Sequence, residues 1–152
     1  MEFKIIEQKN RGLNVYKNED LIFYSTIKTN WLKTNLIKIF DKSGNKIIEL
    51  NKTGIFTDKI RILNQNIEFT KNISEIKTLK ICYGKSIQIK TSIIIFPFLK
   101  PKIFYYNNGP IGVLKENFKP KKEFTLTIEE ENIEFLNPII FYILTINTDF
   151  EN

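Results

Sequence analysis

The chain has 152 residues, of which 42% are hydrophobic and 26% charged, and it carries a net charge of +6 with one cysteine and no histidine. This length and composition are typical of a single globular domain, residues 1–152, that buries its own core. One cysteine excludes an intramolecular disulfide, no signal peptide is evident, and no uncharged apolar run approaches the ~18 residues of a membrane span. We therefore expect a cytoplasmic protein.

The charges are distributed unevenly along the chain. Residues 1–60 hold 11 basic and 7 acidic side chains, residues 61–122 hold 12 and 3, and residues 123–152 hold none and 7. Solvated strand faces produce such a pattern, and so does an anion-binding surface in the basic middle of the chain. Both interpretations stay open from the sequence, as does a fold in which the acidic end covers the basic middle.

Short alternating segments separated by turn residues run through most of the chain, which is typical of all-β proteins. The sharpest turn signal is Asp41 followed by Gly44, because aspartate starts such turns and glycine supplies the positive φ. The expected strands are residues 3–7, 13–16, 21–28, 36–40, 46–51, 55–63, 67–70, 77–83, 86–96, 102–106, 111–115, 123–129 and 133–136.

The last segment differs from the rest, because the eight residues between Pro138 and Asn147 are uncharged and only Thr145 among them is not large and apolar or aromatic. Without a polar stripe, this segment must be surrounded by protein. Asn137, which is placed to cap a helix, and Pro138 favour a helix start, whereas the β-branched and aromatic residues favour a buried strand. A barrel of about 12 strands has a lumen too wide for its own side chains to fill. We therefore expect a mostly β fold, a closed antiparallel β-barrel of about 12 strands around a C-terminal hydrophobic helix at residues 138–148, with a buried strand as the alternative.

Several stretches form a further pattern across most of the chain: Phe23-Tyr24-Ser25 followed by Trp31, the run from Ile37 to Gly44, the run from Ile111 to Lys115, and the apolar segment after Asn137-Pro138. In this pattern the chain resembles the tubby C-terminal-like superfamily, which includes the LURP-one-related proteins and the phospholipid scramblases. The resemblance implies a twelve-stranded barrel around a hydrophobic C-terminal helix. It also implies, by analogy of fold, phosphoinositide binding as seen in some tubby-like proteins.

The chain is poorly supplied with residues for catalysis or metal binding. It lacks histidine, the commonest general base near neutral pH, so Cys82 has no usual activating base. Gly84-Lys85-Ser86 resembles the end of a phosphate-binding loop, but Leu79 stands where that loop needs glycine. The acidic residues 129–131 are expected to face water at a turn. We therefore expect no enzyme activity, no catalytic residue, no metal and no cofactor.

A run of aromatic residues interleaved with lysine spans residues 96–106. Such runs occur where side chains insert at a membrane interface, and lysine binds phosphate as a point charge that needs no particular spacing. The alternative is that the aromatic side chains are core and the lysines protect strand edges. The candidate anion- or lipid-binding residues are Lys100, Lys102, Lys115, Lys119, Lys121 and Lys122, with Phe98, Tyr105 and Tyr106 as candidate aromatic contacts.

These observations favour a non-catalytic binding module whose basic surface binds anionic lipid head groups or another polyanion at the periphery of a membrane. The alternative is a protein-binding adaptor, or an immunity-type protein that neutralises a partner enzyme. Nucleic acid is not an expected partner. A carrier of apolar small molecules would need an empty lumen, which the C-terminal segment would occupy.

Overall fold

The computed structural model describes residues 1–30, 34–53, 59–80, 85–91, 101–117 and 119–148. Within these residues lie three helical segments, α1 (Ile67–Thr70), the 3-10 helix η2 (Glu130–Phe135) and α2 (Leu136–Asn147). The same residues form ten strands: β1 (Glu2–Glu7), β2 (Leu13–Lys17), β3 (Asp20–Thr29), β4 (Asn35–Asp41), β5 (Lys46–Thr53), β6 (Lys59–Gln65), β7 (Gln88–Thr91), β8 (Lys102–Tyr106), β9 (Gly109–Asn117) and β10 (Glu123–Ile128). The prediction of a mostly β chain with a C-terminal helix is confirmed.

The ten strands form one antiparallel sheet in the order β6-β5-β4-β3-β2-β1-β10-β9-β8-β7. Two meanders, β1 to β6 and β7 to β10, are joined where β1 pairs with β10. Side chains alternate between the two faces, so that Phe3 and Ile5 of β1 are buried while Lys4 is exposed. The β1–β10 pairing also places the loops that follow β1 and precede β10 next to each other.

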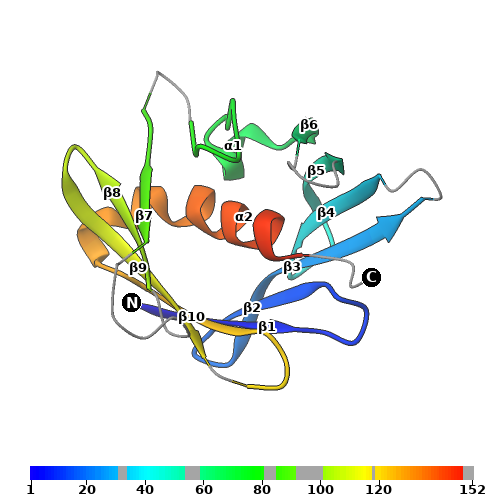
Figure 1. Ribbon diagram of the computed structural model, residues 1–152, viewed down its shortest axis with the longest axis horizontal. Coiled ribbons are helices and arrows are strands. Elements are labelled where there is room, and N and C mark those ends of the chain that lie inside the picture. Colours follow the sequence, from blue (N-terminus) through cyan, green and yellow to red (C-terminus); the bar gives the residue numbers. More distant parts are fainter. Residues whose placement is uncertain (31–33, 54–58, 81–84, 92–100, 118, 149–152) are drawn as a thin grey trace.

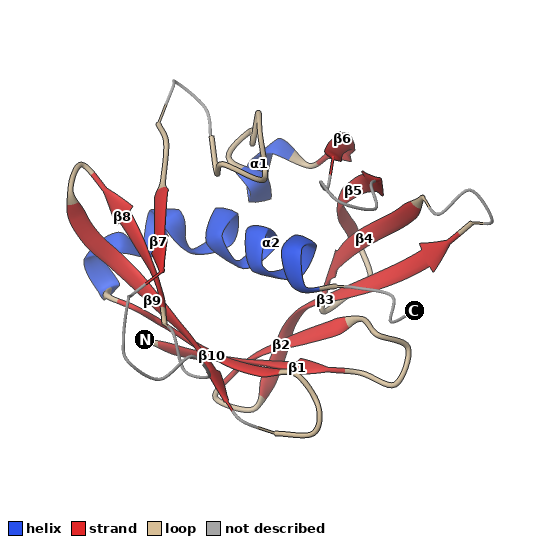
Figure 2. Ribbon diagram, in the orientation of Figure 1, coloured by secondary structure: helices blue, strands red, loops and turns tan. Residues whose placement is uncertain are grey.

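The sheet curls around α2, with β8 to β10 on one side, β1 and β2 below, and β3 and β4 on the other side (Figures 1 and 2). The expected closed barrel is wrong for the described residues, because β6 and β7 end the strand order and no pairing joins them. Between these two edges the core is completed by residues that are not in strands: Ile73, Ile76 and Leu79 are buried in the same cluster as α2. The sheet therefore covers the helix without closing.

Helix α2 is buried on nearly every side, from Pro138 to Thr145. The helix prediction is confirmed, with a start two residues earlier than expected and an end at Asn147. Burying each large apolar side chain contributes about 1.5–3 kcal/mol, so this helix anchors the core. The Phe141 ring meets that of Phe23 edge to face at 5.1 Å. Asn137 does not cap the helix as predicted, and its Nδ2 donates instead to the carbonyl oxygen of Phe69 at 3.2 Å.

Residues 67–80 were expected to hold two strands, and here the prediction is wrong. Asn66 caps α1 by accepting the Glu68 N–H at 3.1 Å, and Lys71, with φ 56°, ends it. Residues 76–79 form a turn between Glu75 and Lys80, which make an isolated β-bridge, and residues 81–84 lie outside the described residues. Four alternating residues are too few to distinguish a strand from one helical turn, so the cap decides the outcome.

The expected strand at 133–136 is also wrong, because Glu130–Phe135 forms η2 and leads directly into α2. The turn at Asp41 is confirmed: its Oδ1 accepts the N–H groups of Ser43 and Asn45, each at 2.9 Å, and Gly44 has φ 84°. In the part of the chain that the structure describes, no helix is long and apolar enough to span a membrane.

Candidate functional site

Two loops carry a concentration of positive charge, the β1–β2 loop and the β9–β10 loop. They adjoin because the Glu7 N–H donates to the Lys122 carbonyl oxygen at 2.9 Å, which extends the β1–β10 pairing. Residues 4–11 and 115–123 together hold seven cations and three acids, here called the basic cluster: Lys4, Lys9, Arg11, Lys115, Lys119, Lys121 and Lys122 with Glu7, Glu116 and Glu123. The local excess of four positive charges is assembled by the sheet from two ends of the chain.

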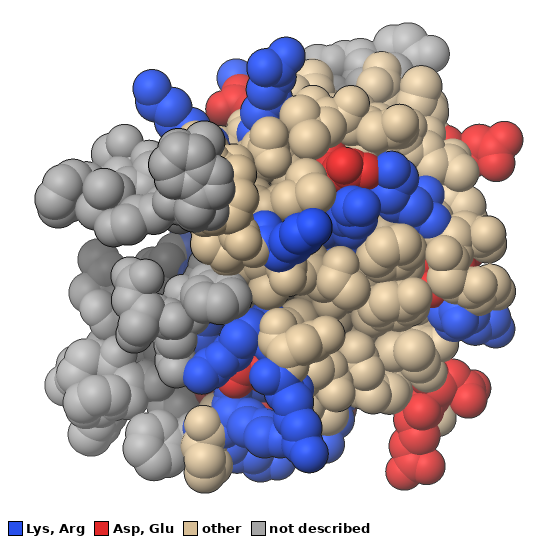
Figure 3. All heavy atoms as spheres, turned by 90° about the vertical axis from the view of Figure 1, so that its right-hand side faces the viewer, with Lys and Arg blue, Asp and Glu red and all other residues tan. Residues whose placement is uncertain are grey.

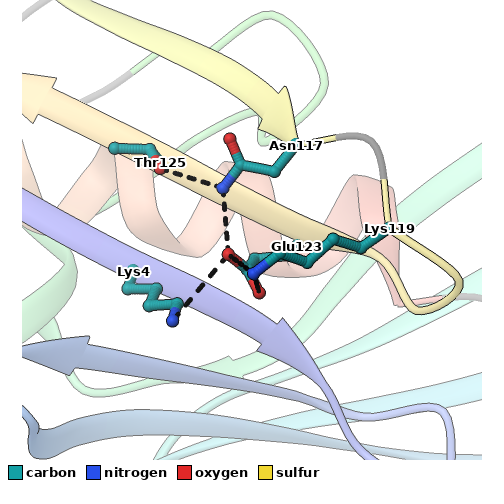
Figure 4. Close-up of polar contacts among 5 residues, drawn as sticks. All are labelled: Lys4, Asn117, Lys119, Glu123 and Thr125. Carbon is teal, nitrogen blue, oxygen red and sulfur yellow. Dashed lines mark hydrogen bonds and ion pairs between the residues drawn. The ribbon is translucent and has the colours of Figure 1, made fainter.

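Glu123 ties the lysine-bearing loop to the sheet (Figure 4). Its side chain is only 10% exposed, and its two oxygens lie 2.8 and 2.9 Å from the Lys119 Nζ. The Asn117 Nδ2 donates to the same carboxylate at 3.0 Å, and the Lys4 Nζ reaches it from β1 at 3.8 Å. The hydrogen bond from Lys119 is the main cause that lowers the pKa of Glu123 below its ordinary value, so the carboxylate stays ionised.

Glu7 holds the other side of the same loop. Its Oε2 accepts the backbone N–H of Lys122 at 3.2 Å, and its Oε1 accepts from the Arg11 guanidinium at 3.2 Å. Because Glu7 is buried, its carboxylate interacts with the loop that it binds and is little exposed to solvent. Two buried acids thus fix the backbone and the innermost cations of the basic cluster.

The outer cations of the basic cluster are Lys9, Lys115 and Lys121, which are all exposed. None of them forms an ion pair within the described residues. On the right-hand side of Figure 1, Figure 3 shows one group of Lys and Arg side chains in the lower half, with acidic atoms among them, and further Lys and Arg side chains across the upper half. The arrangement presents exposed ammonium groups around an inner set of cations that Glu7 and Glu123 neutralise in part.

The predicted site residues are only partly brought together. The structure brings Lys115, Lys119, Lys121 and Lys122 together in the basic cluster. Lys102 does not, because it pairs in register with the buried Leu114 and so shares the inner face of the sheet. Lys100 and Phe98 lie outside the described residues.

The two predicted aromatic contacts make intramolecular contacts away from the basic cluster. The Tyr106 ring packs on Phe135 at 4.7 Å between centroids, and the Lys85 ammonium lies 5.8 Å from both rings. The Lys90 ammonium lies 4.7 Å from the Tyr105 ring, across the β7–β8 pairing. Both tyrosines therefore stabilise the β7–β8 end of the sheet.

Sequence reasoning missed the contribution of the N-terminal segment, namely Lys4, Glu7, Lys9 and Arg11. The Glu7–Lys122 contact joins residues 115 positions apart, and nothing in local spacing indicates it. The Lys119–Glu123 pair did have a local signal, since the two residues are four positions apart. Among the described residues, no group of three or more cysteine, aspartate or glutamate side chains is placed to hold a metal ion.

Comparison with known proteins does not assign the chain to a family. No protein-family model matches the chain, and no curated protein matches it. One solved structure, the X-ray structure of a protein from Arabidopsis thaliana, is similar with 9% sequence identity and a TM-score of 0.47, over 97% of this chain and 92% of that chain. The functional interpretation therefore depends on the basic cluster itself.

Proposed function

We propose that the protein is a non-catalytic binding module whose basic cluster docks on membrane surfaces bearing anionic phospholipid head groups. The observation that supports this most is the juxtaposition of seven cations and three acids on two adjoining loops and the strand ends beside them, with Glu7 and Glu123 buried by their neighbours. These two buried acids hold the loops in place, while the exposed lysines keep their charge toward solvent. The resemblance of the sequence to tubby-like proteins agrees with this proposal.

Physical chemistry favours a membrane surface over a single small anion. Lysine ammonium groups act as point charges, and each contributes about 1 kcal/mol near an anionic leaflet. Lys9, Lys115 and Lys121 are exposed and come from three different parts of the basic cluster. Such spread charges sum over many lipid head groups, whereas a small anion would need donors that converge on one point. The expected location is the cytoplasmic face of a membrane.

Vesicle flotation tests the proposal directly. The protein is mixed with vesicles of phosphatidylcholine alone or of phosphatidylcholine with phosphatidylserine, at low and raised salt. We expect flotation only with phosphatidylserine and a loss of flotation at raised salt, because screening shortens the range of these charges. Absence of flotation with anionic vesicles at low salt would contradict the proposal and favour a protein partner.

Two variants with the same net charge separate a local site from a general charge effect. The test variant carries Lys9→Gln, Lys115→Gln and Lys121→Gln, and the control carries Lys28→Gln, Lys42→Gln and Lys71→Gln; all six lysines are exposed. At about 1 kcal/mol for each lysine, the test variant should bind anionic vesicles on the order of 100-fold more weakly. The control should retain most of the binding. Equal losses would show that net charge alone is responsible.

A further inference from the structure

Strand β6 is an edge of the sheet, and its outer side borders a groove. Within the described residues, no strand pairs with this edge, whereas β5 pairs with the inner edge. The groove has a volume of about 540 Å³ and is lined by residues 60–65 on one side and 72–76 on the other. An unpaired strand edge presents backbone N–H and C=O groups that can bind another extended chain.

The far wall of this groove is held by a side chain. The Gln65 Nε2 donates to the Ile73 carbonyl oxygen at 2.9 Å, and the Gln65 Oε1 accepts the Ile73 N–H at 2.9 Å. The Thr70 hydroxyl fixes the same Gln65 oxygen at 2.6 Å. Because a side chain joins Ile73 to β6, the segment 72–76 stands beside the strand and is not paired with its backbone.

The two faces of β6 differ in chemistry. Lys59 and Arg61 are exposed on one face, while Ile60 and Ile62 lie half-buried on the other and pack against the core. Beyond them the register jumps, so Leu63 is the extra residue of a bulge and is 45% exposed. The regular part of the edge is therefore residues 59–62, with cations and isoleucines in alternation.

The charge balance of the groove is positive. Its acid, Glu75, is paired with Lys80 of the same chain at 2.9 Å, which offsets the negative charge of Glu75. Arg61 lines the groove and is exposed, and it forms no ion pair within the described residues. Leu63 and Ile67, two of the three exposed large hydrophobic side chains in the described residues, lie at the end of the same strand and just after it.

We propose that β6 binds an extended segment of a partner protein in which acidic residues alternate with apolar ones, by addition of a strand to the sheet. The partner's backbone pairs with residues 59–62, its acidic side chains lie beside Lys59 and Arg61, and its apolar side chains extend the packing of Ile60 and Ile62. Opposite charges directly across two strands attract each other, and apolar pairs do the same on the other face. This interaction is independent of the basic cluster and of lipid.

A model peptide tests this inference. The probe is an end-capped, fluorescent peptide of alternating valine and glutamate, and its binding is followed by anisotropy and by shifts of the amide signals of residues 59–62. Three comparison peptides are a valine–lysine version, a version with the same composition in block order, and a version N-methylated at alternate amides. We expect only the alternating acidic peptide to bind, with N-methylation weakening it more than tenfold, because several backbone hydrogen bonds are lost.

Charge reversal supplies the matched variant. Lys59→Glu with Arg61→Glu should weaken the acidic peptide roughly tenfold and allow the valine–lysine peptide to bind in its place, because both cross-strand pairs change sign. Both residues are exposed, so the fold should tolerate the change. The inference is overturned if the N-methylated and parent peptides bind alike, or if the valine–lysine peptide gains nothing on the reversed variant.

Two other occupants of the edge would also overturn the inference. If deletion of residues 149–152 increases peptide binding severalfold, the chain's own acidic end competes for the groove. If the protein is dimeric in solution and the reversed variant is monomeric, a second copy occupies the edge. If the variant that lacks residues 149–152 binds the peptide with unchanged affinity, and if the parent protein is monomeric, the results support a separate partner protein.

Discussion

The Lys52 ammonium of β5 donates to the Ile146 carbonyl oxygen, at 3.2 Å, in the last turn of α2, and Lys52 is only 5% exposed. The last four carbonyl groups of a helix have no partner within the helix, and its C-terminal end carries partial negative charge. A cation from the surrounding sheet therefore completes the end of the central helix. The contact joins residues 94 positions apart and links helix to sheet through a charge.

Replacing this lysine should weaken the fold. Lys52→Met keeps the length of the side chain but removes the charge and the donor, and we expect the free energy of unfolding to fall by about 1–2 kcal/mol. Urea unfolding at neutral pH measures the change. Lys28→Met, at an exposed position of β3, is the control and should change stability by less than about 0.5 kcal/mol. A Lys52→Met protein as stable as the parent would show that the cost of burying the ammonium offsets its bond.

A second prediction concerns the close approach of Gly12, the residue just before β2, to strand β3. A Cβ at this position would lie 2.1 Å from the carbonyl oxygen of Ser25, a backbone atom. The Ser25 hydroxyl is buried, accepts the Leu13 N–H at 2.9 Å and lies 2.6 Å from the Thr148 hydroxyl. Moving Ser25 would therefore disturb the end of α2 as well.

Gly12→Ala should lower the free energy of unfolding by about 3 kcal/mol, near the upper end for an overpacked site. The control is Gly109→Ala, where the nearest atom to the added Cβ is the Tyr106 carbonyl oxygen at an ordinary 3.5 Å. Thermal unfolding of both variants distinguishes a steric effect from the general effect of replacing glycine. Equal losses in the two variants would contradict the steric explanation.

The β2–β3 hairpin offers a stabilising change. Lys17 pairs with Asp20, so the loop is Asn18-Glu19, with φ values of 48° and 70°. Two positive φ angles define a type I′ turn, in which glycine is preferred at the second position. A side chain in the left-handed region costs about 1–2 kcal/mol, and part of this is offset by the entropy that glycine loses on folding.

Glu19→Gly should therefore raise the free energy of unfolding by about 0.5–1 kcal/mol. Asp20→Gly, one residue further on at the first position of β3, should lower it, because glycine weakens a strand. Differential scanning calorimetry should show a higher melting temperature for Glu19→Gly and a lower one for Asp20→Gly. If Glu19→Gly lowers the melting temperature, then the glutamate contributes more than its backbone conformation costs.

Part of this architecture could be predicted from the sequence because its signals are local. The segment from Pro138 to Ile146 has no polar face, so it must be buried, and the turn at Asp41 carries its own hydrogen-bonding pattern. Closure of the sheet could not be predicted, because it depends on whether β6 and β7 meet. The strand prediction at residues 67–70 was wrong because the cap at Asn66 outweighed a short alternation.

Only the β9–β10 part of the basic cluster could be predicted, because only that part has a local signal in the sequence. Lysines 115 to 122 are close in sequence, and their grouping needs only a hairpin. Lys4, Lys9 and Arg11 join them through the β1–β10 pairing, whose register no local pattern indicates. Lys102 was grouped with Lys115 by charge, although the register with Leu114 turns it to the other face. A run of lysines in the sequence shows how many charges are present, whereas the pairing of the strands decides which of them lie on the same surface.

The Lys119–Glu123 pair predicts a specific pH dependence. The hydrogen bond from Lys119 is the largest cause that lowers the pKa of Glu123 below its ordinary value of 4.5. Because the folded-state pKa lies below the unfolded-state value, this contribution to stability is present above about pH 4.5 and is lost as the pH falls through the lowered pKa. The Lys119 side chain is 51% exposed, so the coupling of the pair at neutral pH should be at most about 1 kcal/mol.

A double-mutant cycle measures this coupling separately from other carboxyl groups. Lys119→Met, Glu123→Gln and the double variant are unfolded with urea at neutral pH and again at several pH values below 4.5. We expect a favourable coupling at neutral pH that shrinks toward zero as Glu123 becomes protonated, while either single change alone destabilises the loop at neutral pH. A coupling that is the same at all pH values would mean that Lys119 packs against the loop without using its charge.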